Sequence, residues 1–209
     1  RKALRLSEFR TLVLDEADRM LDMGFIDDMR FLMSGMAPNR QTLFFSATIT
    51  SEIDKLIREF LNNPEKISVK TGATARNVEQ DVVRVPSGEN KIDSLQCLLA
   101  KKEFSKVLIF GRTKNGVERL CQTLVKEGFR AESIHGDKRQ SKRQSALKLF
   151  RDNHSQILVA TDVAARGLDI PNVTHVINYD LPATYEDYVH RIGRTGRADQ
   201  VGTALTFVD

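Results

Sequence analysis

The chain alternates between short apolar runs and longer segments in which apolar residues recur every three or four positions. The short runs are rich in β-branched and aromatic residues and predict strands. They are residues 11–15, 41–48, 66–70, 81–85, 106–111, 131–136, 156–162, 174–180 and 203–208. The periodic segments between them, such as "SEIDKLIREFL" and "NGVERLCQTLVKEG", predict helices that pack by one face. Strands that alternate with helices predict an α/β fold with parallel sheets.

One stretch interrupts this alternation. Residues 71–80, "TGATARNVEQ", are small and polar and follow neither period, so they predict a linker between domains. Residues 81–209 hold enough strands and helices for a complete α/β domain. Residues 1–70 hold only three candidate strands and are expected to be part of another domain.

Composition places the chain among globular proteins, since its 209 residues are 41% hydrophobic and 29% charged. The net charge of +4 fits a polyanionic partner without establishing one. Cys97 and Cys121 show neither disulfide-scaffold nor zinc-site spacing. No apolar run approaches the roughly 18 residues of a membrane span. We therefore expect a cytoplasmic protein that is not bound to a membrane.

Two carboxylates end the first apolar run in "VLDEADRML". Asp15 and Glu16 follow a predicted parallel strand, and open α/β sheets bind ligands at that end of their strands. One carboxylate there commonly holds magnesium while the next polarises a water molecule. An acidic helix N-terminus, favoured by the helix dipole, is the alternative interpretation of this pair.

Two other segments support a ligand site. "SAT" follows the second strand and carries two hydroxyl groups, on Ser46 and Thr48, that could bond to Asp18. "HRIGRTGR", residues 190–197, places an arginine at every third position with glycines between. Its guanidinium groups are suited to phosphate oxygens, although a solvated basic helix end is the alternative.

Taken in order, "DEAD", "SAT", "FGRTK", "HGDKRQSKR", "ATDVAARGLDI" and "HRIGRTGR" resemble the DEAD-box family of ATP-dependent RNA helicases, over essentially the whole chain. The family has two RecA-like domains that close around ATP and a single RNA strand. The resemblance implies that residues 1–70 are the C-terminal part of the first domain and that residues 81–209 are the second. It also implies an enzyme that unwinds short RNA duplexes by ATP hydrolysis at the interdomain cleft.

The resemblance assigns roles around the nucleotide. Asp15 would hold magnesium through water and Glu16 would activate the attacking water. Arg194 and Arg197 would be arginine fingers on the γ-phosphate. Asp169 would contact the ATP ribose. The remaining residues assigned to the nucleotide site and to coupling between domains are Gly167, Asp18, Ser46, Thr48, His190 and Arg191.

The resemblance also assigns contacts to the RNA backbone. These residues are Thr113, Lys114, Gly136, Asp137, Gln140, Arg143 and Thr161. Independently of it, Lys138, Arg139, Lys142 and Arg143 cluster at a predicted strand-to-helix junction, where amide groups and the helix dipole favour phosphate. A solvated charged face is the alternative. Aromatic residues are not interleaved with these cations, which favours sequence-independent binding of the backbone over base stacking.

The chain departs from the family in one respect. Its residues contain no GxxxxGK[ST] segment, whose amides and lysine hold the phosphates in P-loop proteins. We therefore expect the C-terminal part of a helicase, which would be inactive in hydrolysis alone. An ATP-independent RNA-binding or partner-docking module derived from a helicase is the main alternative. A DNA helicase or translocase of the same superfamily is a further one.

Overall fold

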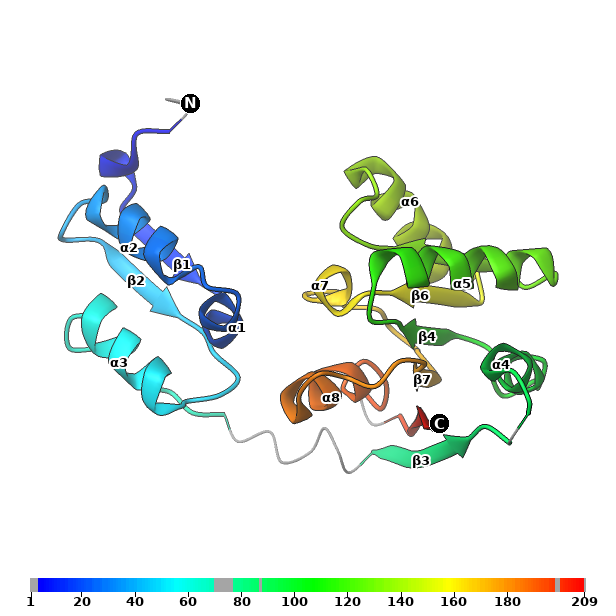
Figure 1. Ribbon diagram of the computed structural model, residues 1–209. Coiled ribbons are helices and arrows are strands. Elements are labelled where there is room, and N and C mark those ends of the chain that lie inside the picture. Colours follow the sequence, from blue (N-terminus) through cyan, green and yellow to red (C-terminus); the bar gives the residue numbers. More distant parts are fainter. Residues whose placement is uncertain (1–3, 70–76, 87, 198–199, 209) are drawn as a thin grey trace. The chain divides into compact units, whose positions relative to one another are not determined.

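The computed structural model describes residues 4–69, 77–86, 88–197 and 200–208. The chain divides into two units, Arg1–Val69 and Lys70–Asp209. In each unit, parallel strands alternate with helices (Figure 1). The predicted class, α/β with parallel sheets, is confirmed.

The first unit has two strands and three α-helices in its described part. They are η1 (Leu6–Glu8, a 3-10 helix), β1 (Thr11–Leu14), α1 (Ala17–Asp22), α2 (Ile26–Ser34), β2 (Gln41–Phe44) and α3 (Ser51–Phe60). The two strands pair in parallel, from Thr11 opposite Gln41 to Leu14 opposite Phe44. Side chains from all three helices pack with these strands in one apolar cluster.

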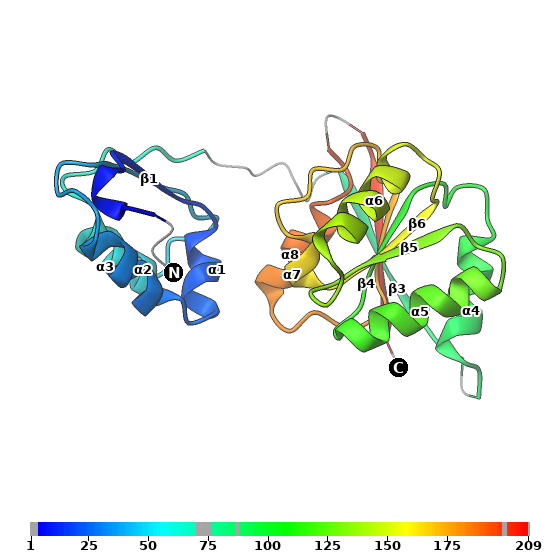
Figure 2. The same ribbon diagram turned by 90° about the horizontal axis from the view of Figure 1, so that it is seen from above.

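The two faces of this small sheet differ. Leu14 is buried against residues of α2 and α3, which lie on the same side of β1 (Figure 2). On the alternate positions, Val13 is 54% exposed and Leu43 is 38% exposed. Because side chains alternate along a strand, these two mark the other face of the sheet. Within the described part of the first unit, that face is uncovered and carries these apolar side chains beside the polar Thr11 and Gln41.

The strand predicted at residues 66–70 is wrong for the residues that the structure describes. Residues 66–69 form no strand, and Ile67 and Val69 are 83% and 79% exposed. Lys70 lies outside the described residues. A strand is stable only beside neighbouring strands, and no described strand pairs with this segment.

The second unit contains six strands and five helices among its described residues. They are β3 (Val78–Arg84), α4 (Lys91–Leu99), β4 (Val107–Phe110), α5 (Lys114–Lys126), β5 (Ala131–Ile134), α6 (Gln140–Arg151), β6 (Ile157–Ala160), α7 (Asp162–Ala165), β7 (His175–Asn178), α8 (Tyr185–Ile192) and β8 (Gly202–Val208). The strands form one parallel sheet in the order β3-β8-β7-β4-β6-β5.

Helices cover both faces of this sheet. Val107 and Ile109 of β4 pack with residues of α4 and α5, whereas Leu108 and Phe110 pack with residues of α6 and α7. Figure 2 shows α4 and α5 on one side of the sheet and α6, α7 and α8 on the other. Every residue of β4, β6 and β7 is therefore buried, which explains why β4 and β6 are continuous apolar runs in the sequence.

The predicted linker at residues 71–80 overlaps a strand. Val78–Gln80 belong to β3, which pairs with β8, and residues 71–76 lie outside the described residues. β3 is an edge strand in which only Val78 is fully buried, so it lacks the apolar pattern of a central strand. No helix among the described residues is long and apolar enough to cross a bilayer.

Candidate functional site

Asp15 and Glu16 lie at the carboxyl end of β1. Glu16 has φ 50° and ψ 47°, a left-handed conformation that costs a non-glycine residue about 1–3 kcal/mol. Its amide donates to Oδ1 of Asp15 at 2.9 Å. Among the described residues, the exposed Asp15 carboxylate forms no ion pair and remains available to a cation.

Asp18 joins α1 to the segment after β2. Its Oδ2 accepts hydrogen bonds from the Ala47 amide at 3.1 Å and from the amide and hydroxyl of Thr48, both at 3.0 Å. Its Oδ1 accepts from the Arg19 amide at 2.9 Å. Burial alone would raise the pKa of Asp18, but the hydrogen bonds from Thr48 and Arg19 outweigh burial and lower it. Asp18 thus acts inside the first unit, with both oxygens engaged by protein groups.

Both predicted hydroxyl groups act on Asp18. Thr48 bonds to it directly, and Ser46, whose Oγ donates to the Thr48 carbonyl oxygen at 2.7 Å, also helps to lower the pKa of Asp18. Ser46 therefore braces the turn that presents Thr48. A role of either residue in coupling the domains stays a prediction.

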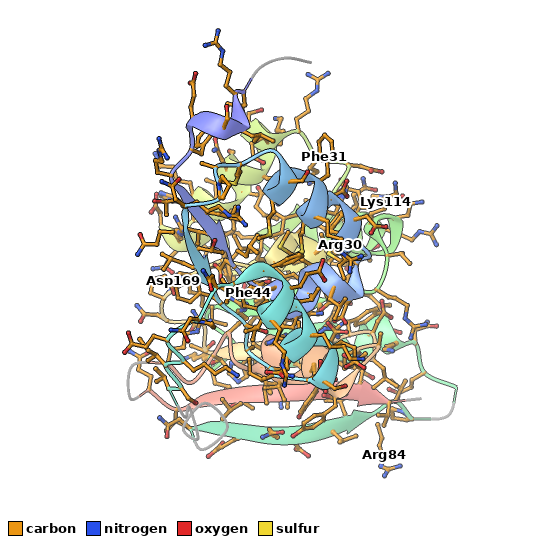
Figure 3. All side chains as sticks on the ribbon, turned by 90° about the vertical axis from the view of Figure 1, so that its left-hand side faces the viewer. Arg30, Phe31, Phe44, Arg84, Lys114 and Asp169 are labelled. Carbon is orange, nitrogen blue, oxygen red and sulfur yellow. The ribbon has the colours of Figure 1, made fainter. Side chains whose placement is uncertain are left out.

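In the second unit, the structure brings the "RGLDI" and "GRTGR" segments together. Arg197 Nη1 donates to Asp169 Oδ1 at 2.9 Å, and its Nε donates to the Gly193 carbonyl at 2.7 Å. Arg194 Nη1 donates to the Leu168 carbonyl at 2.7 Å. The Asp169 side chain is 87% exposed (Figure 3), so its ion pair with Arg197 is open to solvent and weak. Because this ion pair is weak, Arg197 can exchange it for another anion.

Two glycines shape these segments. Gly167 has φ 64°, and no atom lies within 4 Å of the position that a Cβ would take. Glycine is therefore favoured there by the backbone conformation and not by a lack of space. Gly196 has φ 66°, and a Cβ there would lie 2.7 Å from a Val78 methyl group and 2.8 Å from the Asn77 carbonyl oxygen. Gly196 therefore needs both its conformation and its lack of a side chain.

Arg191, assigned above to coupling between domains, lies in the interior of the second unit. Its Nε and Nη2 donate to the two carboxylate oxygens of Asp162 at 2.6 and 2.8 Å. Its Nη1 donates to the Asp180 carbonyl at 2.7 Å, and the guanidinium lies over the Phe110 ring. The side chain is 2% exposed. Arg191 links α8 to α7, and its spacing in the motif carries no signal that it is buried.

The residues assigned to RNA gather at one edge of the large sheet. They follow β4, β5 and β6, which are neighbours in the order β4-β6-β5, and parallel strands end at the same edge. The group comprises Thr113, Lys114, Gly136, Asp137, Gln140, Arg143 and Thr161. Figures 1 and 2 show α5, α6 and α7 beginning at these strand ends. The amino ends of α5 and α6 therefore also face this edge, where they favour anions.

Contacts within this group fix several of its members. Lys114 Nζ lies 2.7 Å from Asp137 Oδ2. Thr113 caps α5, since its hydroxyl accepts from the Gly116 amide at 3.0 Å. Arg143 Nη1 donates to Gln140 Oε1 at 3.4 Å. The structure thus places the "FGRTK" and "HGDKRQSKR" segments side by side.

The members of the basic cluster, Lys138, Arg139, Lys142 and Arg143, differ in whether their charges face solvent or a protein group. Arg139 and Lys142 are exposed and form no ion pair among the described residues. Lys138 instead turns inward, with its Nζ 3.1 Å from Glu118 Oε2 and 2.6 Å from Ser133 Oγ. In this structure the charge of Lys138 is paired with the Glu118 carboxylate, whose side chain is 36% exposed, and is not directed to solvent. Sequence reasoning missed Glu118, whose only signal is an acid four residues after Lys114 on the same helix face.

Comparisons with known families match both units. The model described as "DEAD/DEAH box helicase" matches residues 1–56, and that described as "Helicase conserved C-terminal domain" matches residues 90–199. The DEAD-box ATP-dependent RNA helicase CshA of Geobacillus kaustophilus is 49% identical over 209 residues, which are 100% of this chain and 44% of that protein. CshA of Bacillus subtilis is 46% identical over 100% of this chain and 42% of that protein. The chain thus spans less than half the length of these relatives.

Solved structures show the same fold. Saccharomyces cerevisiae Dbp5 bound to RNA and ADP BeF3 matches with a TM-score of 0.84 at 31% identity, over 98% of this chain and 55% of that chain. A DEAD box protein from Methanococcus jannaschii matches with a TM-score of 0.59 at 38% identity, over 98% and 55%. The RecA-like parallel-sheet prediction is therefore confirmed.

Proposed function

The chain belongs to the DEAD/DEAH-box helicase family, and from this premise we propose that its protein is an ATP-dependent RNA helicase. The enzyme would hold single-stranded RNA by its backbone and separate short duplexes. One observation carries the proposal: the residues assigned to RNA follow three neighbouring strands and meet at one edge of the large sheet. The relatives named as ATP-dependent RNA helicases support it.

This edge suits phosphates better than bases. It offers the amino end of α5 beside Thr113 and the exposed cations Arg139 and Lys142. Phosphate contacts position a nucleic acid without reading its sequence. We therefore propose that RNA is bound here with little regard to sequence.

Asp15 and Glu16 fit a magnesium nucleotide. Magnesium in such sites is held by one or two carboxylates, with water and phosphate oxygens completing its shell. No group of three metal-ligating residues occurs in the described part of the chain, so Asp15 would supply a single carboxylate of this kind. Bound magnesium would neutralise charge on the phosphates.

The chain's other groups have separate tasks in this proposal. Glu16, held in its left-handed conformation at the start of α1, would orient the attacking water. Arg194 and Arg197 would stabilise the charge that develops on the transferred phosphoryl group. Asp169 would accept a hydrogen bond from the ribose.

RNA-stimulated phosphate release by the protein made from the complete reading frame tests the proposal. Single-stranded RNA should raise the rate of ATP hydrolysis, and Glu16→Gln should abolish that increase. Asp22→Asn, an equal loss of charge at the exposed end of α1, is the matched control and should leave the rate unchanged. The 209-residue chain, which contains no GxxxxGK[ST] segment, should show no RNA-dependent release. Equal rates with and without RNA in the complete protein would refute the function.

A further inference from the structure

The carboxylate of Glu118 gathers three donors from a different part of the chain. Its Oε2 accepts from Ser133 Oγ at 2.7 Å and lies 3.1 Å from both His135 Nε2 and Lys138 Nζ. The side chains of His135 and Lys138 are 9% and 24% exposed. Glu118 lies on α5, whereas its partners lie on β5 and in the turn that follows. The cluster therefore ties that turn to the helix.

The turn is closed on itself and held at both ends. The Lys138 amide donates to the His135 carbonyl at 3.1 Å, so the four residues from His135 to Lys138 form a hydrogen-bonded turn. The side chains of its first and last residues both reach Glu118. Gly136 and Asp137, the middle residues, are exposed. Glu118 thus fixes the two ends of a turn whose centre is offered to solvent.

The same helix holds the turn at a second point. Lys114, which Figure 3 labels, lies one helical turn before Glu118, and its Nζ is 2.7 Å from Asp137 Oδ2. Both side chains of that pair are more than half exposed, whereas those of Glu118, Lys138 and His135 are 36%, 24% and 9% exposed. The shielded contact is the stronger constraint, because solvent screens the exposed pair.

Charge explains why the cluster is stable. Burial alone would raise the pKa of Glu118, but hydrogen bonds from Ser133, His135 and Lys138 outweigh burial and lower it to about 2. A carboxylate only accepts hydrogen bonds, so His135 donates from Nε2. Its Nδ1 is buried and finds no hydrogen-bond partner in the described part of the chain. The imidazole therefore depends on Glu118 for its orientation.

We infer that Glu118 is a positioning residue for RNA binding, which orients Gly136 and Asp137 toward the RNA backbone through the turn from His135 to Lys138. Lys138 serves as its counter-ion and makes no contact with phosphate. This inference rests on the proposed function. Lys138 thus holds the turn, whereas Arg139, Lys142 and Arg143, which follow the turn in the chain, are left to contact phosphate.

Titration of the 209-residue chain with a labelled oligouridylate, at several salt concentrations, tests the inference. Glu118→Gln should weaken binding by about tenfold, the scale of one lost hydrogen bond to a charged group. Lys138→Met should weaken binding while leaving the slope of log K against log salt unchanged. Arg143→Ala, which removes an assigned phosphate contact, should reduce that slope by about 0.7. Glu127→Gln, at the exposed end of the same helix, is the matched control and should change neither.

Two further measurements separate positioning from folding and from the proposed function. Hydrogen exchange of the amides of residues 136–138 should be faster in Glu118→Gln, and the exchange of β4 should not. The effects of Glu118→Gln and Lys138→Met on affinity should be less than additive in the double variant.

Several outcomes would overturn the inference. A fall in slope for Lys138→Met equal to that for Arg143→Ala would make Lys138 a phosphate contact. A lower melting temperature for Glu118→Gln with unchanged RNA affinity would make the cluster a structural brace only. If the wild-type chain bound no RNA, the proposed RNA binding would fail. Exchange at residues 136–138 would still decide whether Glu118 holds the turn, and unchanged exchange would show that it does not.

Discussion

Arg197 Nη1 donates a hydrogen bond to Asp169 Oδ1 at 2.9 Å, although both residues are assigned to the binding of a nucleotide. The arginine would bind the γ-phosphate and the carboxylate would bind the ribose. Because the pair is solvent-exposed, separating it costs little. The pair would therefore have to open for the two side chains to take these roles, and its exposure makes opening cheap.

Substitution of the arginine fingers should affect turnover, whereas substitution of Asp169 should affect nucleotide binding. In the complete protein, Arg194→Ala or Arg197→Ala should lower kcat by roughly a thousandfold or more, the scale on which arginine fingers act. Asp169→Ala should mainly raise KM for ATP. Steady-state hydrolysis with saturating RNA measures both. Turnover within a few-fold of wild type would show that the substituted arginine is not a finger.

Substitution of Arg191 should lower the stability of the second unit. Arg191→Met leaves Asp162 without its partner in a partly buried site and should destabilise the second unit by about 3–5 kcal/mol. The double variant Arg191→Met with Asp162→Leu should recover much of this loss, because no uncompensated charge remains.

Tyrosine fluorescence during urea unfolding measures this effect selectively. The chain has no tryptophan, and its three tyrosines, Tyr179, Tyr185 and Tyr188, all lie in the second unit. The exposed Arg112→Ala is the control and should leave the unfolding midpoint unchanged. If Arg191→Met were as stable as this control, the buried pair would not lock α8 to α7.

The stability of the second unit should depend on the ionisation of Glu118. Its pKa falls from 4.5 to about 2 in the folded chain, since its hydrogen bonds outweigh burial. The folded state therefore binds this proton more weakly than the unfolded state. The stabilisation is complete above pH about 4.5 and is lost as the pH falls toward about 2. Urea midpoints across this range should show a smaller pH dependence for Glu118→Gln than for Glu127→Gln, and equal dependences would contradict the assignment.

The sequence predicts most reliably those strands of the sheet that are buried on both faces. β4 and β6 appear as continuous apolar runs because helices cover both faces of the sheet. The segment 66–70 has strand-like composition, but composition does not supply a neighbouring strand. The strand predicted at residues 81–85 overlaps β3, but Val78–Gln80 fall in the predicted linker, because only Val78 of this edge strand is buried and the segment has no apolar pattern.

The site shows a similar limit. Motif order was enough to group Thr113, Gly136 and Thr161 at one edge, because parallel strands end together. It could not tell that Arg191 is enclosed while Arg197 is partly exposed, since spacing carries no information about burial. Glu118 was missed because its donors are 15 to 20 residues away in sequence and meet it only after α5 packs beside β5.

Binding of unrelated single-stranded RNAs by the 209-residue chain, measured at several salt concentrations, tests the central claim most directly. Contacts to phosphate release counterions, so affinity should fall steeply with salt and be nearly equal for all sequences. Reversing the charges of Lys142 and Arg143 should flatten this dependence. The account predicts a steep response without sequence preference. A flat salt response, or strong preference for one sequence, would contradict binding of the RNA backbone at this edge.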